Sequence, residues 1–283
     1  MSGSGAAAGI GLLSAASWGG SDFAGGLGAR RSPAMLVVAS GHIVSLVLLL
    51  AFCVGMHVAL PERPFLVYAA IGGFEGSLAL ALFYRALAMG PMGLTAALTG
   101  LLTALVPVLF SLFHDGLPTP LTAGGLLLGL AAIWLITHSP GKANETPATP
   151  PMALLLGAVA GIGFGTQLLL FKMASGGGIL WAMTSARAAG VAALVLVLIA
   201  RPPSAPWRGF WLFGVLAGLL DTLGNLFYIQ ATSIGRLDVA AVVCSLYPGG
   251  TILLAALVLR EWPTRRQMAG IGVALGAVVL LSQ

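Results

Sequence analysis

Ten long runs of apolar residues, separated by short segments rich in Pro, Gly and Arg, set the pattern of this chain. A helix needs about 20 mostly apolar residues to cross the hydrocarbon core of a bilayer, and each run is close to that length. The pattern therefore predicts ten transmembrane helices, at residues 6–28, 33–55, 65–88, 92–113, 120–138, 152–173, 179–200, 208–231, 236–259 and 265–281.

One polar linker, 139–151, divides the ten predicted helices into five plus five. We therefore expect a first five-helix repeat at 1–138 and a second at 152–283. Because each repeat has an odd number of spans, the second repeat must enter the membrane from the opposite side. Inverted repeats are typical of secondary transporters, which bind their substrate near the midplane where the two halves meet.

The two halves also match each other in sequence. Residues 72–110 and 218–256 each read as two apolar helices joined at a Gly, and a shift of 145 residues aligns the two regions, to within one residue at their ends, without a gap. The same shift aligns Gly90 with Gly235, Pro118 with Pro263, Thr119 with Thr264 and Gly125 with Gly270. This duplication predicts an all-α integral membrane protein with ten transmembrane helices as two inverted five-helix repeats.

Composition excludes an ordinary soluble protein. Hydrophobic residues make up 58% of the 283 positions, charged residues only 7%, and the mean hydropathy is +1.02. A soluble domain carries about a quarter charged residues, so this chain cannot cover its own surface in water. The net charge of +5 lies in the connecting loops and does not point to nucleic acid as a partner.

No motif for enzymatic chemistry is present in the sequence. The four histidines are scattered over different spans and loops, and neither an HExxH zinc motif nor a GxSxG nucleophile motif occurs. No nucleotide-binding motif follows from the Gly-rich segments. We therefore expect no catalytic residue, no metal and no cofactor, and a carrier that would draw on an ion or substrate gradient.

The few ionisable residues at membrane depth are the candidates for function, because placing a charge at the bilayer centre costs at least ~2.5 kcal/mol. Glu75 lies near the middle of the third predicted span, and Asp221 has nearly the same position in the eighth. Asp22 lies past the middle of the first. The alternative is that Glu75 and Asp221 are structural and pair with Arg187, or that Asp22 only caps a helix end.

Helical spacing groups these carboxylates with aromatic and amide side chains. Trp18 and Asp22 are four residues apart, so they share one helix face. Asp221, Asn225 and Tyr228 follow the same spacing. Carboxylates beside aromatic rings suit a cationic or zwitterionic substrate, since a desolvated cation–π contact contributes ~2 kcal/mol. Low dielectric favours the protonated carboxyl, as a proton-coupled carrier would need.

Several short motifs resemble the EamA-type branch of the drug/metabolite transporter (DMT) superfamily. They are the run FYRALAMGP at 83–91, the pair Trp18-Gly19, and the repeated Pro-Thr before a Gly-rich final span in each half. The resemblance implies ten helices in two inverted repeats, a central cavity and alternating access. Members of this family move amino acids, organic cations, nucleobase-like compounds and sugar derivatives.

This chain departs from the family pattern at two places. Arg187 stands where the seventh span of the family often carries an Arg, but no Arg stands near Gly41 in the second span. The second repeat also reads YIQAT at 228–232 in place of the YRAL run at 84–87.

The candidate residues for substrate binding or coupling are Trp18, Asp22, Glu75, Gln167, Arg187, Asp221, Asn225, Tyr228 and Tyr247. The aromatic members could instead be packing residues, and the amides could only tie helices together. Pro107 and Pro248 lie inside predicted spans and are candidate hinges for opening.

Together these features predict a secondary transporter, more specifically an exporter, of small metabolites such as amino acids or organic cations. The alternative is a flippase for a lipid-linked head group, which would need a cavity open sideways to lipid. The expected partners are a small-molecule substrate, membrane lipid and a proton as coupling ion. We expect a multi-pass protein of the cell (inner) membrane, present as a monomer or weak dimer.

Basic residues predict the orientation of the chain in the membrane. Loops after odd-numbered spans hold nine Lys and Arg residues, and loops after even-numbered spans hold three. Because cytoplasmic loops carry the excess of positive charge, the odd-numbered loops are expected in the cytoplasm and both termini outside.

Overall fold

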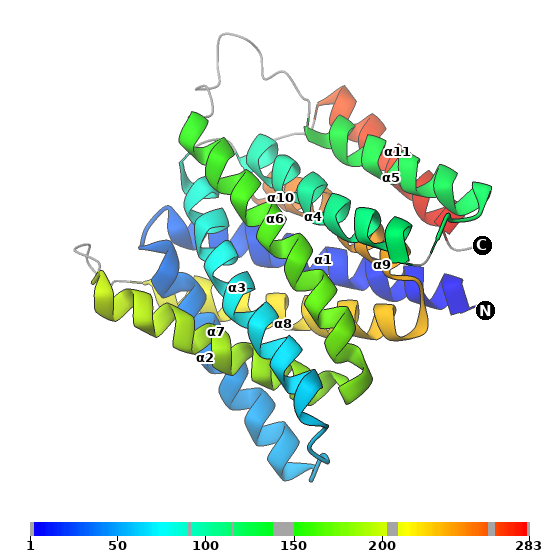
Figure 1. Cartoon of the computed structure of the whole chain (residues 1–283). Coiled ribbons are helices and arrows are strands. Elements are labelled where there is room, and N and C mark those ends of the chain that lie inside the picture. The colour runs from blue at the N-terminus through cyan, green and yellow to red at the C-terminus, as the bar shows by residue number, and fades with distance from the viewer. Residues whose placement is uncertain are drawn as a thin grey trace.

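The chain is a bundle of helices in a computed structural model, which describes residues 3–89, 92–114, 116–137, 150–202, 209–259 and 264–281 (Figure 1). The helices of the first half are α1 (Gly3–Ala29), α2 (Ala34–Gly55), α3 (Arg63–Ala88), α4 (Met92–His114) and α5 (Pro120–Thr137). Those of the second half are α6 (Pro151–Ala174), the 3₁₀ turn η1 (Ser175–Gly177), α7 (Ile179–Ala200), α8 (Phe210–Ile234), α9 (Leu237–Cys244), α10 (Tyr247–Leu259) and α11 (Arg265–Leu281).

Helix boundaries agree with the predicted spans to within a few residues, and proline accounts for several of them. Pro33 directly precedes α2, and α6 begins at Pro151. Proline suits a helix start because the first N–H groups of a helix have no partner within it. The predicted turn at Gly90 and Pro91, and most of the linker 139–151, lie outside the described residues.

Within the described residues, the ninth predicted span departs from the prediction of a single helix. It is two helices, α9 and α10, with a break at Ser245 and Leu246. Pro248 explains this break, because its ring would clash with the carbonyl of Cys244, four residues earlier, in a continuous helix. By contrast, α4 continues through Pro107.

The helices of the two halves pack in matching pairs (Figure 1). The contact of α1 with α8 has its counterpart in that of α6 with α3, and the contact of α2 with α8 in that of α7 with α3. Likewise the contact of α4 with α6 has its counterpart in the contacts of α9 and α10 with α1. Two further contacts join equivalent helices, α5 with α11 and α2 with α7. Exchanging each helix for its equivalent in the other half therefore preserves the packing, as expected for a duplicated chain.

Glycines permit two of these matching contacts. A Cβ atom added at Gly218 of α8 would overlap the backbone of Gly41 of α2. A Cβ atom added at Gly73 of α3 would likewise overlap the backbone of Ala186 of α7. Both pairs of positions are related by the shift of 145 residues, so the same close helix approach occurs twice.

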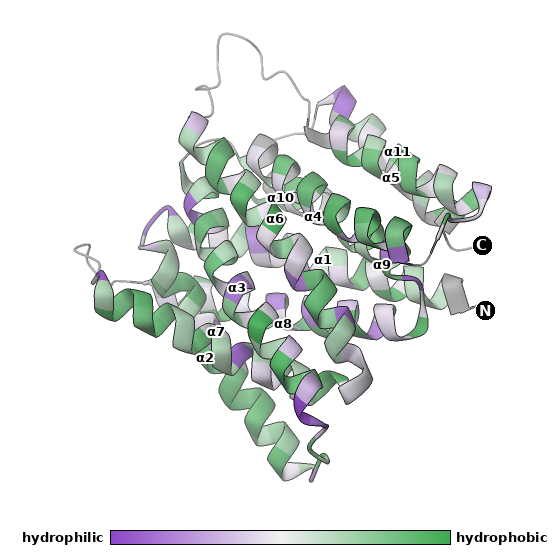
Figure 2. Cartoon of the chain, viewed as in Figure 1, coloured by the Kyte–Doolittle hydropathy of each residue, from purple (hydrophilic) through white to green (hydrophobic). Residues whose placement is uncertain are grey.

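Hydrophobic residues predominate along the helices (Figure 2), and many large apolar residues are exposed on the outside of the bundle. Six helices among the described residues are long and apolar enough to cross a membrane, at Ala34–Gly55, Arg63–Ala88, Pro151–Gly177, Ile179–Ala200, Trp211–Ile234 and Leu237–Val258. These do not include α1, whose Ser14 and Ser21 donate hydrogen bonds to carbonyls of α8. Polar residues of the first span thus form hydrogen bonds inside the bundle.

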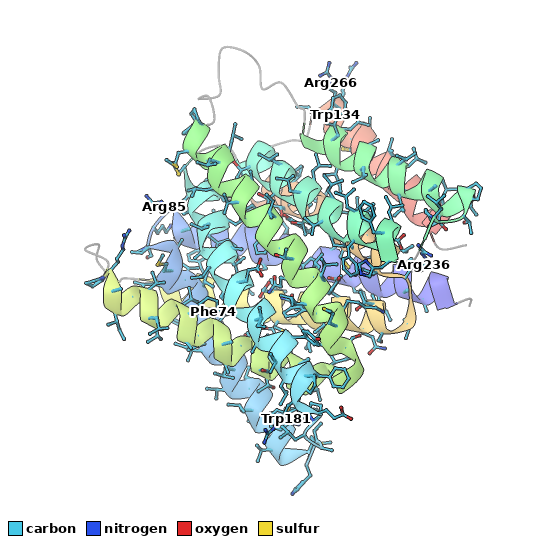
Figure 3. All side chains as sticks on the ribbon, viewed as in Figure 1. Phe74, Arg85, Trp134, Trp181, Arg236 and Arg266 are labelled. Atoms are coloured by element: carbon cyan, nitrogen blue, oxygen red, sulfur yellow. The ribbon has the colours of Figure 1, made fainter. Side chains whose placement is uncertain are left out.

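The two ends of the bundle carry different side chains. Arg85 at the end of α3 is exposed and lies far from Trp181, near the start of α7 (Figure 3). Trp181 donates its Nε1–H to the carbonyl of Val58 at 2.9 Å, next to the start of α3. Such pairs of polar anchors at opposite ends are typical of helices that span a bilayer.

Candidate functional site

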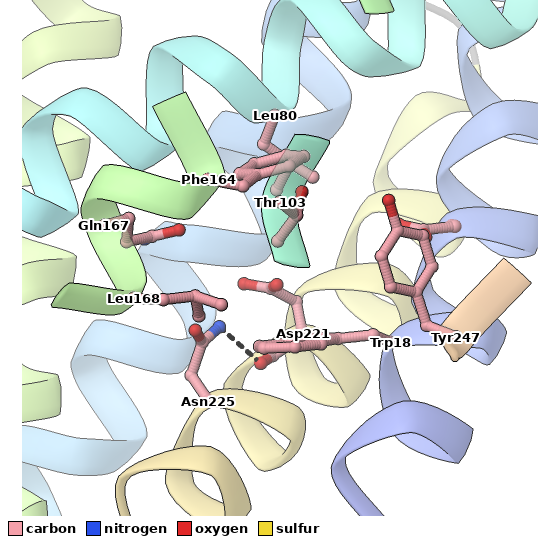
Figure 4. A pocket seen from close by; sticks show the side chains of 10 residues that line it. Trp18, Leu80, Thr103, Phe164, Gln167, Leu168, Asp221, Asn225 and Tyr247 are labelled. Carbon is pink, nitrogen blue, oxygen red and sulfur yellow. Dashed lines mark hydrogen bonds between the residues drawn. The ribbon is translucent and has the colours of Figure 1, made fainter. Parts of the chain in front are cut away.

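A cavity lies where helices of both halves meet, and its empty space of about 370 Å³ includes a part that is open to the outside (Figure 4). We call this cavity the central pocket. Its lining residues come from α1, α3, α4, α6, α8 and α10, and they are Trp18, Asp22, Leu80, Thr103, Phe164, Gln167, Leu168, Asp221, Asn225 and Tyr247. Both halves therefore contribute to one site.

Six of the nine candidate residues line this pocket: Trp18, Asp22, Gln167, Asp221, Asn225 and Tyr247. Helical spacing accounts for much of this grouping. Trp18 and Asp22 point inward from one face of α1, and Asp221 and Asn225 do so from one face of α8. Asn225 also donates to the main-chain carbonyl of Asp221 at 2.7 Å, which orients its side chain (Figure 4).

Asp221 has a fixed positive partner. Its Oδ2 lies 2.5 Å from Nη2 of Arg187, which is only 3% exposed. Arg187 also donates its Nε–H to the hydroxyl of Thr222 at 3.1 Å. The carboxylate at this side of the pocket is therefore charge-compensated by a residue of α7.

His42 lies beside both members of this pair, because its Nε2 is also 3.7 Å from Oδ2 of Asp221. The Nη1 of Arg187 lies 2.6 Å from Nε2 of His42, and Nδ1 of His42 lies 3.1 Å from the hydroxyl of Ser77. Because a guanidinium only donates, we assign Nε2 as the acceptor and Nδ1–H as the donor to Ser77. Ser77 in turn donates to the carbonyl of Gly73 at 2.6 Å. His42 is therefore neutral in this arrangement.

Sequence analysis missed His42 as a site residue, although a signal was present. His42 precedes Arg187 by 145 residues, the offset that relates the two repeats. The second span thus has His42 at the position equivalent to Arg187, and the two side chains contact each other. The same register aligns Asp221 with Gly76, so Glu75 and Asp221 lie one residue apart in the two repeats.

Asp22 differs from Asp221 in having no fixed partner. Within the described parts of the chain, its carboxylate makes no hydrogen bond and no ion pair, although the residue is only 6% exposed. Aromatic rings lie beside it in the pocket wall. Trp18 and Tyr247 meet edge to face with centroids 6.3 Å apart, and Phe164 packs edge to face on Phe83 at 5.8 Å.

Three candidate residues lie outside the pocket lining. Glu75 is half-buried between α3 and α6, where the hydroxyl of Thr166 donates to its carboxylate. Tyr228 is fully buried and donates its hydroxyl hydrogen to the carbonyl of Leu168 at 2.9 Å. Arg187 reaches the pocket only through Asp221.

The two candidate hinges are both buried beside the pocket. Pro107 follows the lining residue Thr103 by one helical turn. Because proline has no backbone N–H, the carbonyl of Thr103 lacks its usual hydrogen-bond donor in the helix. Pro248 follows Tyr247 at the start of α10. Their role in opening stays a prediction.

These features together define a polytopic helical membrane protein with repeated halves around a polar pocket. The chain belongs to the EamA-like transporter family, which matches it twice, over residues 5–138 and 151–283. The two matches confirm the predicted family and the predicted fold class. The chain is therefore a multi-pass transporter rather than an enzyme.

One solved structure supports the same fold. A protein described as "Crystal structure of protein" is 21% identical to this chain and has a TM-score of 0.76, covering 97% of this chain and 96% of its own. At that identity the likeness carries the fold alone. No curated protein matches the chain.

Proposed function

We propose that this transporter is a secondary carrier for a small solute with a cationic centre, such as an organic cation or an amino acid, moved by alternating access through the central pocket. The observation that carries this proposal is the buried carboxylate of Asp22, which lines the pocket without a partner beside Trp18 and Tyr247. A buried charge is costly unless it is paired, and an ammonium group would supply the missing partner.

The other lining residues suit the rest of such a solute. Trp18, Phe164 and Tyr247 present aromatic rings, which attract a desolvated cation by ~2 kcal/mol. Gln167 and Asn225 offer amide groups that can donate to a carboxylate or accept from an ammonium. This combination of apolar wall and few polar groups is typical of small-molecule sites.

The burial of the pocket lining favours a small solute over a lipid-linked head group. Leu80, Thr103 and Leu168, which line it, are nearly inaccessible from outside the bundle. A flippase would need an open side toward lipid for the acyl chains to pass.

We further propose that the carrier is an exporter of the cell (inner) membrane and that a proton is the coupling ion. Asp22 is the group suited to this coupling, because without a fixed cation it can hold either a proton or the solute. An interior-acid gradient should then accelerate uptake into liposomes, since protons leave as the solute enters. Equal uptake with and without the gradient would remove the proton from the proposal.

Reconstitution in liposomes tests the proposed function. Uptake of radiolabelled tetraethylammonium and of a panel of zwitterionic amino acids is measured for the wild type and for Asp22→Asn. We expect Asp22→Asn to lower uptake at least about tenfold, because a hydrogen bond to a charged group contributes ~1.5–3 kcal/mol. Glu75→Gln is the comparison, since it removes a carboxylate in the membrane that lies outside the pocket.

A loss of uptake in Glu75→Gln but not in Asp22→Asn would contradict the placement of the cation. Absence of uptake of every probe by the wild type would contradict the proposed substrate class.

A further inference from the structure

The buried polar groups next to the pocket form one connected cluster, which we call the junction cluster. It consists of His42 of α2, Ser77 of α3, Arg187 of α7, and Asp221 and Thr222 of α8. Each of these residues is at most 8% exposed. The cluster joins two helices of the first half to two of the second, and it meets the pocket at Asp221.

The junction cluster is built from repeat-equivalent positions. His42 and Arg187 are 145 residues apart, and so are Ser77 and Thr222. His42 contacts Ser77 at 3.1 Å, and in the matching contact Arg187 donates to Thr222 at 3.1 Å. Ser77 then donates to Gly73, and Thr222 donates to Gly218 in the same way. The two halves thus hold the same hydrogen-bonded frame with different charges.

The charges are unequal because the halves have diverged. The second half carries Arg187 and Asp221, where the first half carries the neutral His42 and Gly76. The first half therefore has no carboxylate at the position equivalent to Asp221. The side chain of Gln167 packs over Gly76 at that position. Gln167 is itself the repeat equivalent of Asp22, and its amide is neutral. The carboxylates of the pocket wall are therefore Asp22 and Asp221.

Of these two carboxylates, only one is free to pair with a solute. Arg187 compensates Asp221 at 2.5 Å, and His42 and Thr222 fix the guanidinium in place. Asp22 has no fixed cation among the described residues. The pocket with its surrounding cluster therefore offers one carboxyl group that has no fixed positive partner.

We propose that Arg187, positioned by His42, is a specificity-determining residue that limits the pocket to solutes with a single uncompensated positive charge. It acts through Asp221 rather than by touching the solute. This inference rests on the proposed function, because it concerns the same pocket. A solute with two cationic centres would bury its second charge without a partner, and this penalty is what discriminates against it.

Two probes of matched skeleton test this inference. The first, 5,5-dimethylhexyltrimethylammonium, carries one positive charge. The second, 1,4-bis(trimethylammonio)butane, has the same shape and carries two, because a nitrogen replaces the quaternary carbon. Binding of each probe to the purified, detergent-solubilised chain is measured by the rise in melting temperature as its concentration increases. The variants are Arg187→Gln, His42→Gln and the double variant Arg187→Gln/Asp221→Asn, which removes both charges together.

We expect the wild type to prefer the single-charged probe. Arg187→Gln uncovers Asp221, and it should shift the affinity ratio toward the double-charged probe by at least about tenfold, since one further buried charge contact exceeds ~1.4 kcal/mol. The double variant should return the ratio to the wild-type value. His42→Gln loosens Arg187 without removing it and should give an intermediate shift of the affinity ratio. This variant replaces Arg187→Gln in the test if Arg187→Gln fails to fold.

Each result separates the inference from the proposed function on which it rests. Affinity ratios equal to the wild-type value in Arg187→Gln and in His42→Gln would overturn the role of Arg187, while the proposed function would stand. A shifted ratio that the double variant does not restore would also overturn it. Failure of both probes to bind the wild type would overturn the proposed function together with this inference.

Discussion

At the scale of single residues, the two carboxylates of the pocket wall should differ in what they contribute. Asp221 is held by Arg187, whereas Asp22 has no fixed partner in the described chain. Removing one partner of a buried ion pair leaves the other charge uncompensated, at a cost of ~3–5 kcal/mol. Removing an unpartnered carboxylate has no such cost. Stability and solute binding should therefore separate at these two positions.

We predict that Asp221→Asn lowers the melting temperature of the detergent-solubilised protein, while Asp22→Asn leaves it unchanged or raises it. The reason is that only the first change strands a buried guanidinium. Differential scanning fluorimetry of the two variants measures this directly. Equal melting temperatures for both variants would show that the Arg187–Asp221 pair contributes no more than an unpaired carboxylate.

Residue spacing also shows what the sequence could and could not reveal about the site. Six candidates line the pocket because helical periodicity places polar residues four apart on one face. Glu75 is one residue away from the position equivalent to Asp221, and one residue turns a helical side chain by about 100°. Glu75 therefore lies between α3 and α6. Which side chain pairs with Arg187 depends on tertiary contacts that periodicity does not contain.

At the scale of helices, close approach depends on glycine at matching positions. A Cβ atom at Gly218 would overlap the backbone of Gly41, whereas a Cβ atom at Gly272 of α11 would meet no atom within 4 Å. Helix propensity favours Ala over Gly by ~1 kcal/mol, so substitution should stabilise the chain wherever space allows. The contact between α2 and α8 does not allow it.

We predict that Gly218→Ala destabilises the protein by ~1–3 kcal/mol, as overpacking does, and that Gly272→Ala has no destabilising effect. The melting temperatures of the two variants in the same detergent provide the measurement. If Gly218→Ala were as stable as Gly272→Ala, the close packing of α2 on α8 would be wrong.

The break between α9 and α10 could be located from the sequence only in part. Proline in an apolar span predicts a bend, and both Pro107 and Pro248 were candidates. Only the ninth span breaks, at Ser245 and Leu246, while α4 stays continuous. At the break, α10 packs closely on α1, since a Cβ atom added at Gly19 would lie 2.8 Å from the carbonyl of Tyr247.

We predict that Pro248→Ala lowers transport by at least about threefold without abolishing expression, because α9 and α10 could then join into one helix and lose a hinge. Uptake of tetraethylammonium in liposomes is the measurement, and Pro107→Ala is the comparison within a continuous helix. Unchanged uptake in Pro248→Ala would count against a hinge at the break.

At the scale of the whole molecule, the apolar runs were sufficient to predict the fold. They are long, and the bilayer requires every span to satisfy its own backbone, so helix is the outcome for each of them. The predicted spans and the observed helices agree except at the ninth span, which is two helices, and the family matches each half separately. The positions of the basic residues bear on the orientation of the chain in the membrane. Exposed arginines lie at the ends of α1, α3 and α7, and they are Arg30, Arg31, Arg85 and Arg201.

We predict that these arginine-bearing ends face the cytoplasm, following the positive-inside rule. Single cysteines at Arg85 and at Glu62, which lie at opposite ends of α3, report the orientation through labelling of intact cells with a membrane-impermeant maleimide. The native Cys53 and Cys244 are both buried, which keeps the background low. Labelling at position 85 but not at position 62 would reverse the orientation.

The central claim is that the pocket opens to each face of the membrane in turn, and one measurement tests it most directly. Leu80 lines the pocket from α3 at the repeat equivalent of Asn225, so a cysteine there samples the site without removing a polar group. The variant Leu80→Cys is reconstituted in liposomes and exposed to a membrane-impermeant maleimide from one face at a time. We expect labelling from either face, slowed in both cases by tetraethylammonium. Labelling from one face only, under every condition, would contradict alternating access.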